Sequence, residues 1–230
     1  KMAHIKYKIK QKVVPSVTTI LSRYKNSVGL IIWSNKLGLE GKSYHSELNK
    51  AAEIGTNVHE LAQSFIEGQE FQIPKDDDVV QKCFSKFLLW WESFQSEDFQ
   101  VIFCEQSFTS KLYEYGGTAD LLVKKDDQYI LVDFKTSKSV YPDYLIQGSA
   151  YKQMIEEKYH YKISKFIVAR FGKDSEEFET KEFDTHQLEF AFEYFKTLRV
   201  AFDQDKELNK IIKEKKNGNR TDAKKHRNSN

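Results

Sequence analysis

The stretch 115–135, which reads YGGTADLLVKKDDQYILVDFK, carries the pattern that decides the fold. It contains two short apolar runs, and the turn-forming pair Asp126-Asp127 lies between them. Apolar runs joined by a tight turn are typical of neighbouring antiparallel strands. We therefore predict strands over residues 115–124 and 129–135.

The residues around this pair show both strand and helix periodicity. Their spacing predicts helices in pieces over 15–33 and over 46–68, 76–94, 141–158 and 185–202, and further strands over 100–109, 163–171 and 177–183. This order predicts an α+β (mixed α/β) fold, in which helices flank one central sheet and the N-terminal portion is helical. We expect three parts: a helical region over 1–98, a core over 99–205 and a basic, flexible tail over 206–230.

Charged residues interrupt the apolar strands at two points. Asp133 and Lys135 are two residues apart, so they share one face of their strand, and Asp120 can face Asp133 across the strand pair. Two carboxylates held close together repel each other unless a proton or a cation lies between them, and a hard cation such as Mg²⁺ prefers oxygen ligands. The alternative is a solvated edge-strand pair of Asp133 and Lys135, with Asp120 in a turn.

Two acids and a lysine around a metal ion are suited to the hydrolysis of phosphodiesters. The metal stabilises charge on the phosphate, and a lysine positions the water or neutralises the transition state. Glu105 is expected on the inward face of the strand over 100–109, together with Val101, Phe103 and Ser107. It serves either as a catalytic residue at this site or in a structural ion pair, because a buried acid needs a partner.

The order of these residues resembles the PD-(D/E)xK nuclease superfamily, in particular its RecB-like and Cas4-like exonuclease branch. The matching motifs are Gly55-x-x-x-His59, Gly117-x-x-Asp120, Asp133-x-Lys135 and Gln147-x-x-x-Tyr151. The opening Pro15-Ser16-Val17-Thr18 is similar to exonucleases of the mitochondrial genome maintenance type and their phage relatives. The resemblance covers most of residues 15–170 and implies a restriction-endonuclease-like sheet, with the nuclease core over 99–205.

The resemblance also implies a role for each motif residue. His59, Asp120, Asp133 and the carbonyl of Phe134 would bind Mg²⁺ or Mn²⁺, and Lys135 would be the catalytic lysine. Further residues would contact DNA, namely Gln147, Tyr151, Ser16, Thr18, Thr136, Ser137 and Lys138. Without the resemblance, His59 is interpreted as an ordinary core or surface histidine, Gln147 and Tyr151 as helix-packing residues, and residues 136–138 as a polar turn.

Several classes of protein and cofactor are excluded by composition. The chain has two cysteines, Cys83 and Cys104, so the four-cysteine iron–sulfur cluster of some relatives is not expected. The sequence contains no Walker A motif and hence no sign of a helicase motor. It also has no run of 18 apolar residues and no secretory signal, so we expect a cytoplasmic protein without membrane contact.

The total charge of +2 conceals a strong asymmetry. Residues 1–12 carry five lysines and no acid, and residues 206–230 carry nine basic and three acidic residues. Residues 13–205 carry 22 basic and 31 acidic side chains. The basic ends are therefore candidate contacts for the phosphates of DNA.

The leading hypothesis is a metal-dependent DNA exonuclease that acts on single strands or DNA ends in recombination, repair or replication. By family analogy, the N-terminal helical region would supply His59 and an arch over the site. Aromatic residues near polar or basic residues, in this region or beside the site, would stack on single-stranded bases or else pack in the protein, namely Tyr24, Trp33, Tyr44, Tyr141 and Tyr144. Two alternatives remain open, an endonuclease of the same superfamily and a non-catalytic nucleic-acid-binding protein.

Overall fold

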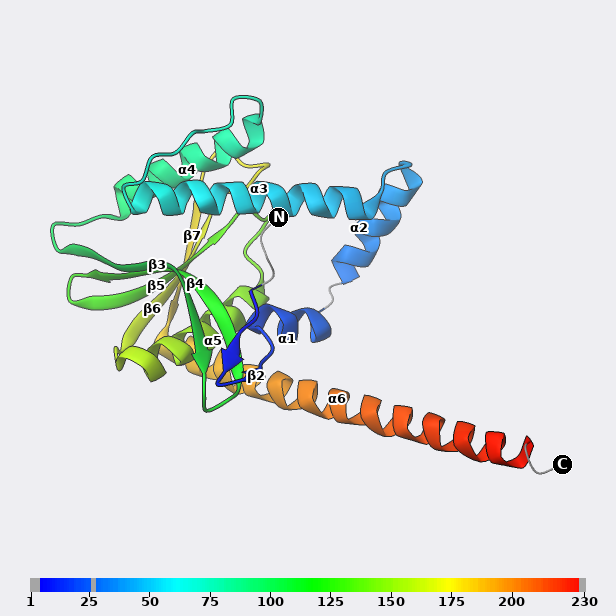
Figure 1. The fold of residues 1–230 in the computed structure, drawn as a ribbon. Helices are drawn as coiled ribbons and strands as arrows, with labels where there is room; N and C mark the ends of the chain where they lie inside the picture. The colour runs from blue at the N-terminus through cyan, green and yellow to red at the C-terminus, as the bar shows by residue number, and fades with distance from the viewer. Residues whose placement is uncertain (1–4, 26–27, 228–230) are drawn as a thin grey trace.

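A mixed five-stranded sheet forms the centre of the molecule (Figure 1). The computed structural model describes residues 5–25 and 28–227, with side chains up to residue 213. The strands of the sheet are β3 (Phe99–Ser110), β4 (Tyr115–Lys125), β5 (Gln128–Lys135), β6 (Ile163–Arg170) and β7 (Glu179–Asp184), and they lie in sequence order. The expected α+β architecture is therefore confirmed.

Three antiparallel strands and one crossover define the topology. β3, β4 and β5 form an antiparallel meander, which contains the predicted antiparallel pair over 115–124 and 129–135. The chain then returns through helix α5 (Pro142–Tyr159), so that β6 lies parallel to β5, and β7 pairs antiparallel with β6. A parallel pair needs such a crossover, and a helix of this length supplies it.

Helices cover both faces of the sheet. The remaining helices are α1 (Val17–Tyr24), α2 (Val28–Leu39), α3 (Tyr44–Ile66), α4 (Asp78–Phe94) and α6 (Thr185–Arg227). One core joins the sheet to α1, α5 and α6, and the other joins it to α3 and α4 (Figure 1). Leu131 of β5 packs into the first core, whereas Val132 and Phe134 pack into the second. Because side chains alternate between the two faces of a strand, β5 contributes residues to both cores.

The helices begin at residues that satisfy their free N–H groups. The Ser16 side chain accepts a hydrogen bond from the Thr19 N–H at 3.0 Å, and Asp77 accepts one from Val80 at 3.0 Å. Pro142 stands at the start of α5, where its missing N–H has no cost. These starts agree with the helices predicted from residues 15, 76 and 141 onward.

The expected alternation along β3 is wrong. The pairing of β3 with β4 shifts by one residue between Val101 and Phe103. Val101 consequently packs on the core beneath α3 and α4, while Phe103 packs on the opposite core. An extra residue in one strand reverses the faces beyond it, because side chains alternate with a period of two.

The two ends of the chain also differ from the prediction. Residues 8–13 form a small hairpin of β1 (Lys8–Ile9) and β2 (Lys12–Val13). The last helix does not end at Phe202, and the backbone of the predicted flexible tail is helical through Arg227 (Figure 1). Lys, Glu and Arg dominate this segment and have high helix propensity, so their polarity does not exclude a helix. Residues 228–230 of that tail lie outside the described residues.

Within the described residues, no helix combines the length and the apolar character that crossing a bilayer requires.

Candidate active site

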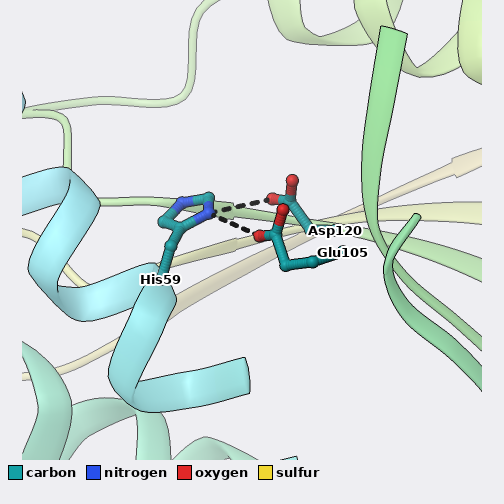
Figure 2. A group of neighbouring side chains, drawn as sticks. All are labelled: His59, Glu105 and Asp120. Atoms are coloured by element: carbon teal, nitrogen blue, oxygen red, sulfur yellow. Dashed lines mark hydrogen bonds and ion pairs between the residues drawn. The ribbon is translucent and has the colours of Figure 1, made fainter. Parts of the chain in front are cut away.

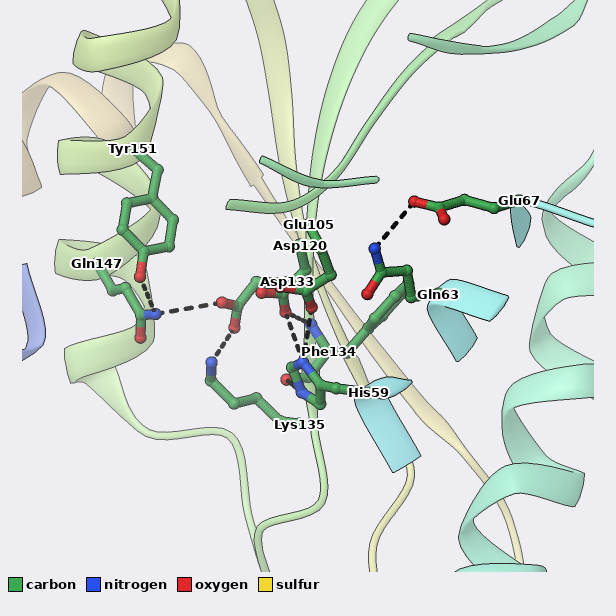
Figure 3. A network of polar contacts seen from close by, with 10 residues as sticks. All are labelled: His59, Gln63, Glu67, Glu105, Asp120, Asp133, Phe134, Lys135, Gln147 and Tyr151. Atoms are coloured by element: carbon green, nitrogen blue, oxygen red, sulfur yellow. Dashed lines mark hydrogen bonds and ion pairs between the residues drawn. The ribbon is translucent and has the colours of Figure 1, made fainter. Parts of the chain in front are cut away.

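The site lies where β4 and β5 separate. Their pairing ends at Leu121 and Val132, so the next two residues, Asp120 and Asp133, stand at the fork between the strands. The Asp120 carboxylate accepts a hydrogen bond from the Phe134 N–H at 2.7 Å. A side chain thereby takes the place of the next ladder bond and holds Asp120 between the two strands (Figure 3).

His59 reaches this fork from helix α3 (Figure 2). Its Nδ1 lies 3.2 Å from Glu105 Oε1 and 3.7 Å from Asp120 Oδ2, and its Nε2 lies 3.0 Å from the carbonyl oxygen of Phe134. Candidate ligand atoms of His59, Glu105 and Asp120 all lie within 4.8 Å of one another. The histidine that the resemblance assigned to metal binding therefore meets two carboxylates and the expected carbonyl.

Glu105 reaches the site because of local backbone irregularity. It stands beside Asp120 on the neighbouring strand and has a φ of 46°. Positive φ values are uncommon for a residue other than glycine and are found at functional sites. The side chain of Glu105 remains partly exposed, so the expectation of a fully inward acid is modified.

Electrostatics couple the three side chains. Burial alone would lower the pKa of His59, but the nearby Asp120 and Glu105 outweigh it and raise that pKa to about 9. Burial raises the pKa of Asp120, although the charge of His59 opposes this effect. Without a metal, a protonated His59 is thus the cation that separates the two carboxylates.

Asp133 and Lys135 form a second, adjoining group. Lys135 Nζ lies 2.5 Å from Asp133 Oδ2 and 4.9 Å from the centre of the Tyr144 ring. Burial raises the pKa of Asp133 to about 6. Burial would lower the pKa of Lys135, but Asp133 and Asp120 outweigh it and raise that pKa, so the ammonium group stays charged. Asp133 contacts Lys135 and lies outside the three-residue group around His59.

Gln147 and Tyr151 stand one turn apart on α5 and face this pair (Figure 3). Gln147 Nε2 donates to the Tyr151 hydroxyl at 2.8 Å and lies 3.4 Å from Asp133 Oδ1. A Cβ atom on Gly117 would lie 2.5 Å from Cε1 of Tyr151, so only glycine admits the tyrosine ring. The motif that contains Gly117 and the motif that contains Gln147 and Tyr151 therefore meet at the Tyr151 ring.

The other predicted DNA contacts are dispersed. The Ser16 hydroxyl caps α1, while Thr18 is exposed. Thr136, Ser137 and Lys138 follow Lys135 in the loop after β5, and the Ser137 hydroxyl donates to the carbonyl of Ser139. Ser16 therefore has a structural role at the start of α1, Lys138 is exposed, and contact of these residues with DNA stays a prediction.

The predicted base-stacking aromatics have protein partners. Trp33 and Tyr44 meet edge to face at 5.4 Å, and the Tyr24 hydroxyl donates to Asp205 at 3.0 Å. Tyr144 lies beneath Lys135, a contact that the sequence did not predict. Tyr141 keeps 46% of its surface exposed and remains the most accessible of the described set named for stacking.

The donor set fits a divalent cation. One imidazole and two carboxylates converge, and the Phe134 carbonyl contacts the other ring nitrogen of His59. Oxygen-rich sets of this kind suit Mg²⁺ or Mn²⁺, with the histidine favouring Mn²⁺. A cation here would relieve the repulsion between Glu105 and Asp120 without needing the proton on His59.

Comparisons with known proteins give distant structural similarities. No family model matches the chain, and no curated protein sequence matches it. A crystal structure from Eubacterium rectale, named "Putative exonuclease", is similar with a TM-score of 0.45 and 13% identity, covering 66% of this chain and 68% of that one. The crystal structure of a protein designated SSO0001 is similar with a TM-score of 0.32 and 15% identity, covering 54% of this chain and 62% of that one.

Proposed function

We propose that this protein is a metal-dependent deoxyribonuclease that acts as an exonuclease on single-stranded DNA or DNA ends. The observation that carries the proposal is the convergence of His59, Glu105 and Asp120 directly beside the buried pair of Asp133 and Lys135. The motif resemblance to RecB-like exonucleases supports the same assignment, including a role in recombination, repair or replication.

His59, Glu105 and Asp120 would hold Mg²⁺ or Mn²⁺, together with the Phe134 carbonyl and with Asp133 at the neighbouring position. The bound metal would supply charge stabilisation at the scissile phosphate and a more acidic water. Because His59 keeps 24% of its side-chain surface exposed, the cluster is accessible from solvent.

The chain's own residues prepare the site for an anionic substrate. Lys135 carries a fixed positive charge, and its Nζ is held by Asp133 on one side and the Tyr144 ring on the other. A preorganised charge of this kind stabilises negative charge that develops on a phosphate. Gln147 is held by Tyr151 and orients Asp133. Because Asp133 in turn holds Lys135, these two residues of α5 position the lysine indirectly.

The test uses three labelled DNA substrates with Mg²⁺ or Mn²⁺: linear single strands, linear duplexes and closed circles. We expect products from linear DNA and none from circular DNA. Cutting of circles would instead support an endonuclease, and binding without cutting under all conditions would support a non-catalytic binding protein.

A lysine variant tests the assigned site. Lys135→Ala should abolish cutting and leave DNA binding in place, because other residues position the strand. Lys82→Ala, which removes an exposed lysine from α4, is the matched control and should keep full activity. Persistence of cutting in Lys135→Ala would show that the assigned site is wrong.

A further inference from the structure

A basic pocket lies at the free edge of β3, outside the candidate active site. Its volume is about 600 Å³, and its walls come from the N-terminal segment, the end of β3 and the end of α5. Lysines dominate the lining: Lys6, Lys8, Lys111 and Lys158. β3 is the edge strand of the sheet, so the pocket opens at the side of the molecule.

The charges of this pocket are not balanced by the protein. Among the described side chains, none of the four lysines forms an ion pair, whereas neighbouring Lys12 lies 2.6 Å from Glu114. The acid in the lining, Glu157, already accepts hydrogen bonds from the Ser110 hydroxyl at 2.7 Å and the Lys111 N–H at 3.1 Å. Four lysines without an ion-pair partner therefore line one pocket, with Lys158 Nζ 4.9 Å from the ring centres of Phe108 and Tyr159, and they offer a site for an anion.

The N-terminal segment is docked so that it connects the pocket to the active site. Tyr7, which lines the pocket, makes a hydrogen bond of 2.9 Å with the hydroxyl of Thr118. Thr118 and Asp120 are two residues apart on β4, which places them about 7 Å apart along one face. A Cβ on Gly116 would overlap the Tyr7 ring, so glycine at this position permits the docking.

We propose that this pocket binds phosphate groups of the nucleic-acid strand that the active site cuts. The inference rests on the proposed function and adds to it a phosphate-binding site remote from the metal ligands. Several lysines spaced around an open cavity suit the separate phosphates of a strand, and a strand crossing Tyr7 and Thr118 leads directly to Asp120.

The test measures binding in EDTA, so that no cutting occurs, with an internally labelled oligothymidylate at a series of salt concentrations. The pocket variant is Lys6→Gln/Lys8→Gln/Lys111→Gln. Each phosphate contact on a single strand contributes about 0.7 to the slope of log affinity against log salt, so three contacts should reduce that slope by about 2. The control variant, Lys75→Gln/Lys82→Gln/Lys181→Gln, also removes three exposed lysines and should keep the slope of the unmodified protein.

Oligonucleotides with a 5′-phosphate, a 3′-phosphate or no terminal phosphate identify the source of the anion. If the pocket variant loses affinity only for the oligonucleotide phosphorylated at one end, the pocket binds that terminal phosphate. If it loses the same affinity for all three oligonucleotides, the pocket binds internal phosphates. Both results support the inference. An equal slope in the pocket and control variants overturns it. The inference is also overturned if inorganic phosphate binds to the pocket but does not compete with binding of the strand.

Cleavage separates this inference from the proposed function. With bis-p-nitrophenyl phosphate, a phosphodiester too short to reach the pocket, the pocket variant should keep the rate of the unmodified protein. With the oligonucleotide it should show a raised KM and an unchanged kcat. If the unmodified protein neither binds strands nor cuts either substrate, the proposed function fails and this inference fails with it.

Discussion

At the scale of single residues, Gly117 determines how closely α5 approaches β4. Gly117→Ala would place a methyl group against the Tyr151 ring, and we expect it to lower the free energy of unfolding by about 1–3 kcal/mol through overpacking. The displaced tyrosine should also release Gln147 and reduce activity. Gly38→Ala is the matched control, because nothing lies within 4 Å of its added methyl group.

Chemical denaturation and cleavage rates check this expectation. Gly38→Ala should leave stability unchanged or raise it by up to about 1 kcal/mol, since alanine favours a helix over glycine. Tyr151→Leu combined with Gly117→Ala should recover part of the lost stability. Equal effects of the two glycine substitutions would contradict the proposed contact.

A pH dependence follows from His59. Its pKa in the metal-free protein is about 9, and a metal requires the unprotonated ring, so protons compete with the metal below pH 9. We expect the apparent Mn²⁺ affinity to rise about tenfold per pH unit between roughly pH 6.5 and 8.5. Calorimetry in buffers of different ionisation enthalpy measures both the affinity and the released proton.

The raised pKa of His59 has the opposite effect on the stability of the metal-free protein, which falls as the pH rises. Because the folded pKa lies above the ordinary value of 6.5, His59 stabilises the fold fully below that pH, and this contribution is lost as the pH rises through about 9. His59→Asn should remove both pH dependences. A Mn²⁺ affinity that does not change with pH would contradict the ligand role of His59.

At the scale of elements, substitutions at the start of α1 test whether Ser16 has a structural role or a DNA-binding role. Ser16→Ala should lower the free energy of unfolding by about 1 kcal/mol, because the Thr19 N–H loses its cap. Thr18 lies two residues further along the chain and is exposed, so Thr18→Ala should leave the free energy of unfolding nearly unchanged. Thermal unfolding and DNA binding are measured on both variants, and a binding loss in Ser16→Ala without a stability loss would restore the DNA role.

At the scale of the whole molecule, the excess of positive charge lies at the two ends of the chain. The part of α6 beyond Asp205 extends past the body in Figure 1, and its described side chains from 206 to 213 are largely exposed. Truncation after Lys206 keeps the pair of Arg23 and Asp205 and removes eight further basic residues. We expect the free energy of unfolding to stay within about 0.5 kcal/mol, and DNA affinity to fall with a weaker salt dependence.

Binding curves at several salt concentrations check the truncated chain against the full one. A matched full-length variant, in which the removed lysines and arginines become glutamine, should show the same loss. An unchanged salt slope in both proteins would place the DNA contacts elsewhere, at the N-terminal lysines or the active site.

Local patterns in the sequence predicted most helices and strands of the body and the shared faces of some candidate residues, whereas the roles of the others came from the motif resemblance. Asp133 and Lys135 are two residues apart on one strand, and Gln147 and Tyr151 are one helical turn apart, so their shared faces follow from local geometry. The meander was predictable because short turns connect strands that are neighbours in sequence. These features depend on interactions over a few residues.

The tertiary structure decided which of these residues meet. A bulge in β3 reversed the predicted face of Phe103. His59 lies 46 residues before Glu105 in the chain, yet only the packing of α3 on the sheet brings them within 3.2 Å. The separation of Asp120 from Asp133 into two charge groups likewise arises from the fork between β4 and β5, because strand pairing ends there and each carboxylate takes a different partner, His59 for Asp120 and Lys135 for Asp133.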